Sequence, residues 1–321
     1  MSRKNELLLF LRLKMQGMTK RQRAAFKKVK PLRQLYPVAL ERTYAKEVSQ
    51  TLKNVVVMAL AKLERRLPTW IKSSENAFRN DAADTELEAY LKELEEGITA
   101  VFAAGGGIAG AVAYVEQLAS RVFQFQQVMF QSQTKVVTGI PLDVDYNWWP
   151  EARKLWANEN HRLIKSLSQE YITKLNTILS TSFQSGWSYA ETVEQIMKLS
   201  DTMTGYRARL IARDQVGKLQ YAITRHQFES VGMDGYLWVT ARDERVRGNP
   251  FGKYPKAIPS HWEIDDKICK WADPTIYSED GRQWLKRTPL MPSVHPGQAI
   301  MCRCVASPYW LPIIEEAENL L

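Results

Sequence analysis

The feature that most constrains the fold is a change of sequence pattern near residue 236. Upstream of it, apolar residues recur at the three- and four-residue spacing of amphipathic helices, as in the long stretch from Glu151 to Phe183. Large apolar and β-branched residues then alternate from Tyr236 to Thr240 as in a strand, and the chain from Asn249 to Pro296 is rich in Pro, Gly and Trp. The pattern predicts a mainly helical protein whose C-terminal part carries short strands and loops.

Local signals mark the ends of several helices. Pro31 and Pro37 interrupt the helical pattern between residues 3 and 66, because proline lacks the N–H that an inner helical turn needs. Ser188 and Glu191 form an S-x-x-E capping box at the start of a shorter helix. We expect a further helix over residues 205–231, closed by Gly232.

These elements predict an α+β fold, with a predominantly helical N-terminal region followed by a helical layer packed on a small C-terminal β-containing domain. Residues 303–305 are predicted as a last strand, and residues 311–321 as a terminal helix with Pro312 in its first turn. The turn-rich stretch over residues 138–150 gives the main boundary. We expect a basic helical arm over residues 1–70, a helical region with a Gly/Ala-rich segment over residues 71–145, and the C-terminal domain over residues 146–321.

The net charge of +9 is concentrated near the N-terminus, since residues 1–66 carry 17 Lys and Arg against four Asp and Glu. Such a concentration of one sign repels itself unless a polyanion lies nearby. Contact with nucleic acid or an acidic protein surface and a merely solvated face are both open interpretations. The candidate contact residues are Lys20, Arg21, Arg23, Lys27, Lys28, Lys30 and Arg33.

An uncharged segment spans residues 98–115, after a predicted acidic helix over residues 81–96. Its length approaches the roughly 20 residues that cross a bilayer, so membrane contact has to be considered. The segment consists mostly of Ala and Gly, which also permit close helix packing or a flexible joint, and insertion is the less favoured interpretation. We see no signal peptide at the N-terminus and expect the chain to stay in the cytoplasm where it is made.

The chain has three cysteines and four histidines, and most of them lie between residues 236 and 304. An odd number of cysteines does not suggest a disulfide framework. A tetrahedral structural zinc site needs four Cys or His ligands, but the C-x₂-C pair common in such sites is absent, so buried packing is the favoured alternative. The sequence therefore predicts either no cofactor or a structural zinc, with the candidate ligands His261, Cys269, His295, Cys302 and Cys304.

Charged residues alternate in DERVRG, which begins at Asp243. In an extended segment Asp243, Arg245 and Arg247 would share one face, as an anion site or as an internal network that fixes a turn, and the turn is favoured. The sequence has no P-loop, no G-x-S-x-G nucleophile motif and no H-E-x-x-H zinc motif. No catalytic residues are predicted, and we expect a protein that is not an enzyme.

The order of these motifs resembles the phage Mu F-like minor head proteins, a family of phage head morphogenesis proteins. The resemblance covers about the C-terminal half of the chain, which it identifies as a Mu F-like domain. It includes RLIARDQV at residues 209–216, the later Trp, the Asp-x-Arg-Val-Arg group, a following histidine matched by His261, and a terminal Cys-Arg-Cys. The signature residues are Arg213, Trp238, Asp243, Arg245, Arg247, Cys302, Arg303 and Cys304.

The resemblance implies a virion protein inside the capsid of a tailed phage, made in the host cytoplasm and present in few copies. Its implied partners are the portal protein, the scaffold or major capsid protein, and packaged DNA, with ejection alongside the DNA left open. The alternative is an enzyme delivered with the genome, a nuclease or an ADP-ribosyltransferase-like effector. One short predicted helix after Trp310 leaves little room for an added toxin domain, which argues against the enzyme.

Overall fold

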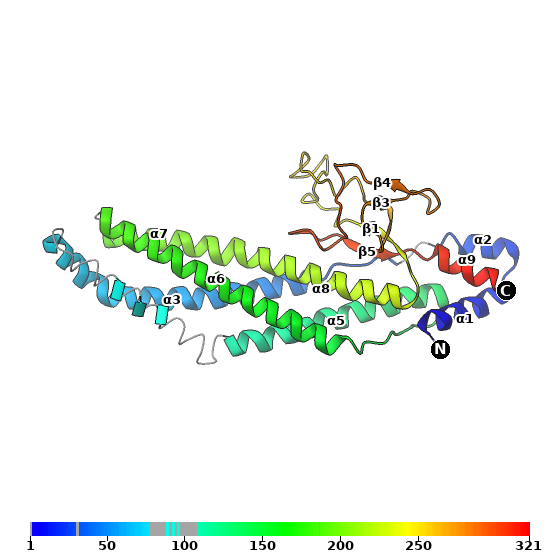
Figure 1. Cartoon of the computed structure of the whole chain (residues 1–321), viewed down its shortest axis with the longest axis horizontal. Helices are drawn as coiled ribbons and strands as arrows, with labels where there is room; N and C mark the ends of the chain where they lie inside the picture. Colours follow the sequence, from blue (N-terminus) through cyan, green and yellow to red (C-terminus); the bar gives the residue numbers. More distant parts are fainter. Residues whose placement is uncertain are drawn as a thin grey trace. The chain divides into compact units, whose positions relative to one another are not determined.

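The structure, a computed structural model, describes residues 2–29, 32–77, 88–89, 92–93, 95–96, 108–185 and 187–321 (Figure 1). They group into two compact units, each built from separate segments of the chain. The sheet unit contains Met1–Val38, Ser120–Pro150 and Arg213–Leu321, and the helical unit contains Ala39–Ala119 and Glu151–Ala212. The predicted α+β fold is confirmed, whereas the predicted boundaries at residues 70 and 145 stay predictions.

The helical unit is built around α3 (Val38–Ala77), α6 (Trp149–Ser185) and α7 (Tyr189–Asp201), which continues into a π-helical turn over Thr202–Arg207. Tyr44 of α3 is fully buried and donates a hydrogen bond of 2.6 Å to the side-chain oxygen of Asn160 on α6. Its ring also lies 6.2 Å from that of Trp156. Buried aromatic area and one satisfied polar pair therefore hold α3 and α6 together.

The sheet unit contains α1 (Arg3–Gln16), α2 (Lys20–Phe26) and α9 (Leu311–Asn319), with most of α5 (Ile108–Thr138) and α8 (Ala208–Ser230). Helix α1 packs against α9, and both supply side chains to one hydrophobic core. Leu7, Leu11 and Met15 of α1 are fully buried there. Ile313 and Ile314 of α9 are at most 2% exposed. The first helix of the chain is thus part of the core that supports the sheet.

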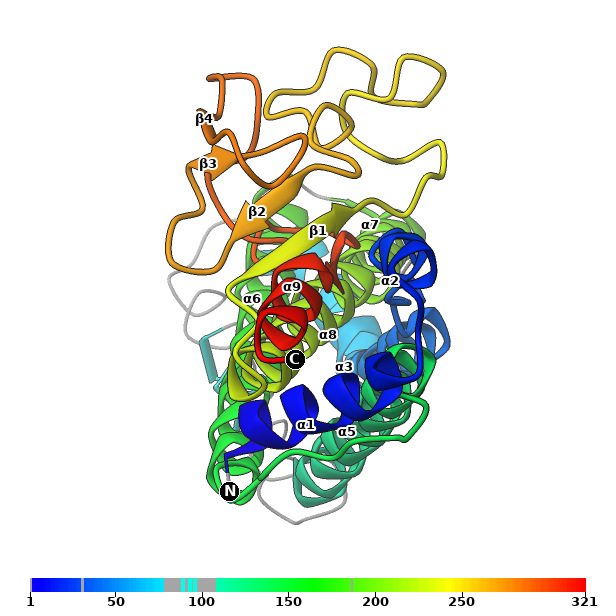
Figure 2. The same cartoon turned by 90° about the vertical axis from the view of Figure 1, so that its right-hand side faces the viewer.

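The sheet has three antiparallel strands in the order β2-β1-β5, and Figure 2 shows β1 and β2 side by side. These strands are β1 (Gly235–Val239), β2 (Ile268–Lys270) and β5 (Val305–Pro308). Two shorter strands, β3 (Ile276–Tyr277) and β4 (Leu285–Lys286), form a separate pair. In the central strand Tyr236 and Trp238 are fully buried, which matches the alternation of residues in the sequence.

Helix α8 approaches the sheet unit's C-terminal segment closely at two glycines. A Cβ added at Gly297, which has a φ of +86°, would lie 2.8 Å from the backbone oxygen of Gly217 on α8. A Cβ at Gly217 would in turn lie 3.3 Å from the backbone oxygen of Cys302. A side chain at Gly297 would clash, and one at Gly217 would be tight, so α8 lies directly against the segment that leads into β5.

Buried glutamines connect the segment after α2 to α5. The side-chain amide of Gln34 donates to Gln126 at 2.6 Å, and that of Gln133 donates to Gln34 at 3.0 Å. All three side chains are at most 3% exposed. These hydrogen bonds form a buried ladder that ties the segment after α2 to α5.

Most predicted element positions are confirmed. The capping box of Ser188 and Glu191 starts α7, Gly232 follows α8 with a φ of +75°, and Pro312 lies in the first turn of α9. The last strand begins two residues later than predicted, at Val305, so the Cys-Arg-Cys segment precedes the strand. Two predicted segments lie largely outside the described residues, namely the acidic helix over residues 81–96 and the uncharged Gly/Ala-rich segment over residues 98–115, of which only residues 108–115 are described, at the start of α5.

Candidate metal centre

The paired ends of β1 and β5 bring together two parts of the chain that are 66 residues apart. Val239 pairs with Val305, so Cys302 and Cys304 lie just before β5, beside the place where the chain leaves β1. Met301 adopts a φ of +62°, and the backbone N–H of Cys302 donates to Ala299 at 3.1 Å. This turn directs both cysteines toward the loop that follows β1.

His261 reaches the same place from the loop after β1. Its backbone N–H donates to the backbone oxygen of Arg247 at 3.0 Å, and that of Ser260 donates to Leu290 at 2.6 Å. The imidazole lies across the ring of Trp238 in a T-shaped arrangement, with 5.7 Å between the ring centroids. Backbone hydrogen bonds and an aromatic contact therefore fix the histidine although its loop has no regular secondary structure.

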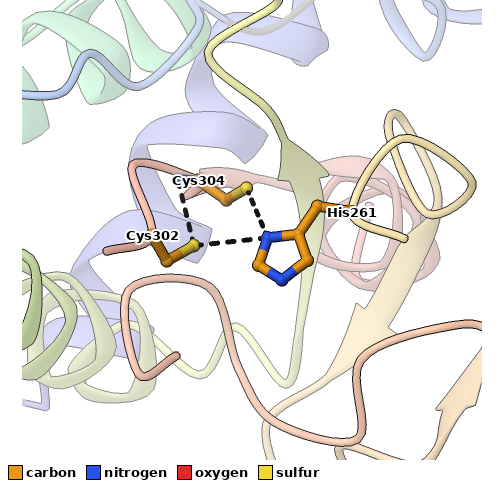
Figure 3. Close-up of side chains that lie close together, drawn as sticks. All are labelled: His261, Cys302 and Cys304. Carbon is orange, nitrogen blue, oxygen red and sulfur yellow. Dashed lines mark hydrogen bonds between the residues drawn. The ribbon is translucent and has the colours of Figure 1, made fainter. Parts of the chain in front are cut away.

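His261, Cys302 and Cys304 form a compact buried cluster, which we call the Cys-His cluster (Figure 3). The Nδ1 atom of His261 lies 3.3 Å from the sulfur of Cys304 and 3.5 Å from the sulfur of Cys302. The backbone N–H of Cys304 also donates to the Cys302 sulfur at 3.3 Å. All three residues are at most 5% exposed, so the cluster is shielded from bulk water.

The two thiols have different acidities. The hydrogen bond from the Cys304 side chain holds the pKa of Cys302 well below its usual value, and His261 acts in the same direction. Burial instead raises the pKa of Cys304 well above its usual value. The arrangement therefore favours the first thiolate of the pair on Cys302.

A hollow with a cavity volume of about 50 Å³ adjoins the Cys-His cluster. Four arginines and one acidic residue contribute to its lining together with the cluster itself. They are Arg213, Asp243, Arg245, Arg247 and Arg303. The side chains around the hollow therefore carry an excess of positive charge.

The DERVRG segment forms turns, as the favoured interpretation of its sequence predicted. The Asp243 carboxylate accepts from the backbone N–H of Arg245 at 2.9 Å and lies 3.9 Å from the guanidinium of Arg303. Arg247 donates to the backbone oxygen of Ile300 at 2.9 Å. These contacts join the segment to the Cys-Arg-Cys segment and to the hollow.

Two of the five predicted zinc ligands lie elsewhere. His295 is hydrogen-bonded through Nδ1 to the hydroxyl of Tyr236 at 2.9 Å, and Cys269 is fully buried on β2, where burial raises its pKa. Among the described His, Cys, Asp and Glu side chains, only the Cys-His cluster comes within metal-binding reach. The structure thus brings three of the five predicted ligands together, because the sequence does not show which histidine meets the Cys-Arg-Cys segment. The zinc itself stays a prediction.

The signature residues of the resemblance converge on this one place. Trp238 contacts His261, and the other seven line the hollow: Arg213, Asp243, Arg245, Arg247, Cys302, Arg303 and Cys304. Sequence reasoning missed Arg287, whose guanidinium lies 5.4 Å from the Trp238 ring and donates to the backbone oxygens of Pro292 and Val294. No local pattern marks that arginine.

The basic residues near the N-terminus are partly committed to contacts within the sheet unit. Lys27 pairs with Glu318 at 2.5 Å and Arg33 with Asp266 at 3.0 Å. Lys20, Arg21 and Lys28 are exposed, Arg23 is half-buried, and Lys30 lies outside the described residues. None of the described helices is long and apolar enough to cross a membrane.

The fold and the cluster define an α+β protein in which a helix covers a small antiparallel sheet and the signature residues gather at the ends of β1 and β5. Residues 173–307 match the family described as "Phage Mu protein F like protein". The match confirms, over these residues, the predicted resemblance to phage Mu F-like head morphogenesis proteins.

One relative is an uncharacterised protein of Haemophilus influenzae, which is 31% identical over 162 residues. The matched part is 50% of this chain and 29% of the relative, so the chain spans less than a third of the length of that protein. No solved structure matches the chain.

Proposed function

We propose that the protein is a minor capsid protein of a tailed phage, located inside the head near the portal, where it aids procapsid assembly. The observation that carries this proposal is the family match over residues 173–307, together with the convergence of the signature residues around one hollow. A head morphogenesis protein acts by binding other virion components. The proposed partners are the portal protein and the scaffold or major capsid protein.

Packaged DNA is the third proposed partner. Lys20 and Arg21 in the first turn of α2 and Lys28 just after it are exposed. A protein inside a filled head is surrounded by phosphate, and each lysine or arginine that neutralises a phosphate releases a bound counterion. These three cations support a role in DNA packaging or ejection, whereas Lys27 and Arg33 are already paired.

Replacing Lys20, Arg21 and Lys28 together by alanine tests the DNA contact. Deleting the N-terminal region is a poorer test, because α1 supplies core side chains. The matched control replaces three exposed cations of α6, Lys154, Arg162 and Lys165, and removes the same charge. For duplex DNA, the slope of log affinity against log salt concentration becomes shallower by about 0.9 for each phosphate contact that is lost. We therefore expect the slope to become shallower by about 2.7 in the first variant and to stay unchanged in the control. Equal slopes for both variants would contradict the DNA contact.

A genome-delivered enzyme, a nuclease or an ADP-ribosyltransferase-like effector, is the second candidate. The observation in its favour is the hollow, which places a carboxylate, four arginines and a buried thiol pair together. Alanine at Asp243, Arg247 and His295 separates the two functions. Normal particle assembly with loss of a catalytic activity would favour the enzyme, whereas failed incorporation into particles would favour the minor capsid protein.

A further inference from the structure

The three ligand atoms of the Cys-His cluster face one common point. Nδ1 of His261 is the nearest polar atom of the ring to both sulfurs, at 3.3 and 3.5 Å. A neutral imidazole nitrogen carries either one hydrogen or one lone pair, so it makes a good hydrogen bond with only one of two thiols. One cation at the centre of the three atoms would satisfy all of them.

The separations fit zinc. With Zn–S bonds of about 2.3 Å and a Zn–N bond of about 2.0–2.1 Å at the tetrahedral angle, a sulfur and a nitrogen ligand lie about 3.6 Å apart. The two observed nitrogen–sulfur distances lie within about 0.3 Å of that value. All three ligand atoms lie within 4.8 Å of one another, and the three residues are buried.

The protein supplies only three such ligands. No fourth His, Cys, Asp or Glu of the described residues joins the cluster. The three residues line the hollow together with Arg245 and Arg247. A zinc ion bound by two thiolates and a neutral imidazole has zero net charge, so the complex does not repel an anion. A water or an anionic oxygen from solution in that hollow would complete the tetrahedron.

A metal would also explain how this region keeps its shape. The chain between β1 and β2, and the chain between β4 and β5, consist mainly of turns and bends. His261 lies in the first of these segments and Cys302 and Cys304 end the second. An ion held by all three would fasten the two segments together, as structural zinc does in small domains with little regular secondary structure.

We propose that Nδ1 of His261 and the sulfurs of Cys302 and Cys304 bind one zinc ion, whose fourth ligand is an oxygen from solution in the arginine-lined hollow. The site goes beyond the proposed role in head assembly, and neither depends on the other. The three proposed ligands belong to the motifs through which the chain resembles the phage Mu F-like family.

The first test is the zinc content of the full chain purified without chelator, with one zinc per chain expected. Cys302→Ser and His261→Ala should each lose the metal, and Cys269→Ser is the matched control because it removes an equally buried thiol on β2 and should keep it. Circular dichroism of each variant shows whether it is folded. Zinc well below one per chain in the unchanged protein, or equal metal loss from Cys269→Ser, would overturn the proposal.

The second test uses Co²⁺ in place of zinc and does not depend on variants that lose a ligand. Four-coordinate Co²⁺ with thiolate ligands has intense visible absorption and a sulfur-to-metal charge-transfer band. We expect both bands, and we expect inorganic phosphate to shift the visible band because it competes for the fourth position. A spectrum without thiolate bands would overturn the assignment of ligands, and a visible band that phosphate leaves unchanged would overturn the fourth ligand from solution.

Discussion

His295 should make the stability of the sheet unit depend on pH. The side chain is 5% exposed, hydrogen-bonded to Tyr236, and stacked 5.6 Å from the ring of Tyr221. Burial lowers its pKa from 6.5 to about 4, and the positive charges of Arg225 and Arg287 act in the same direction, whereas a backbone hydrogen bond at Trp271 opposes them. The folded protein therefore keeps this histidine neutral at pH values where the unfolded chain protonates it.

The direction of the effect follows from proton binding. Between pH 6.5 and about 4 the unfolded chain binds more protons at His295 than the folded protein does, so the free energy of unfolding falls as the pH falls through this window. The full shift corresponds to about 3 kcal/mol. Between pH 7.5 and 5, about 2 kcal/mol of this should be lost, and above pH 7 the contribution should be constant.

Urea unfolding of the unchanged protein and of His295→Gln, at several pH values between 5 and 7.5, measures this contribution. Other titrating groups are common to both proteins, so the difference between their two pH profiles isolates His295. We expect the variant to lose about 2 kcal/mol less than the unchanged protein over this range. His161→Gln, at a half-buried position of the helical unit, is the control. Parallel pH profiles for the unchanged protein and His295→Gln would refute the reasoning.

Three further substitutions test the packing, each by urea unfolding at neutral pH. Tyr44→Phe should lower the free energy of unfolding by about 1–2 kcal/mol, because Asn160 loses its buried hydroxyl donor, and an unchanged midpoint would contradict that pairing. Gly297→Ala should destabilise by about 1–3 kcal/mol, since its φ is positive and its new Cβ would meet the oxygen of Gly217; a neutral result would disprove the close approach. Phe251→Ser, at a side chain 90% exposed, should stay within about 0.5 kcal/mol, and a larger loss would show a packing role.

Elements governed by neighbouring residues were predictable from the sequence. The capping box at Ser188, the alternation in β1 and the proline at the start of α9 each depend on residues a few positions apart. The sequence predicts two separate helices, one that starts at Ser188 and one over residues 205–231. In the structure a π-helical turn connects them without a break. Gly205 lies inside that turn, where helical packing outweighs the low helix propensity of glycine.

The candidate site was only partly predictable, because its residues meet through the pairing of β1 with β5. The sequence indicated Cys302 and Cys304 as candidate ligands, but the choice between His261 and His295 depends on which loop reaches them. The buried glutamine ladder was hidden for the same reason, since Gln34 and its partners are far apart in the chain. The residue types indicated possible metal binding, whereas the fold determined which side chains meet.

The central claim is that the protein is part of the phage particle, and mass spectrometry of purified virions tests it most directly. Intact particles should contain the chain in a few copies per head, far fewer than the major capsid protein. Comparison with particles emptied of DNA shows whether the chain leaves with the genome. Its absence from purified intact particles, when it is present in the lysate that produced them, would contradict the proposed function.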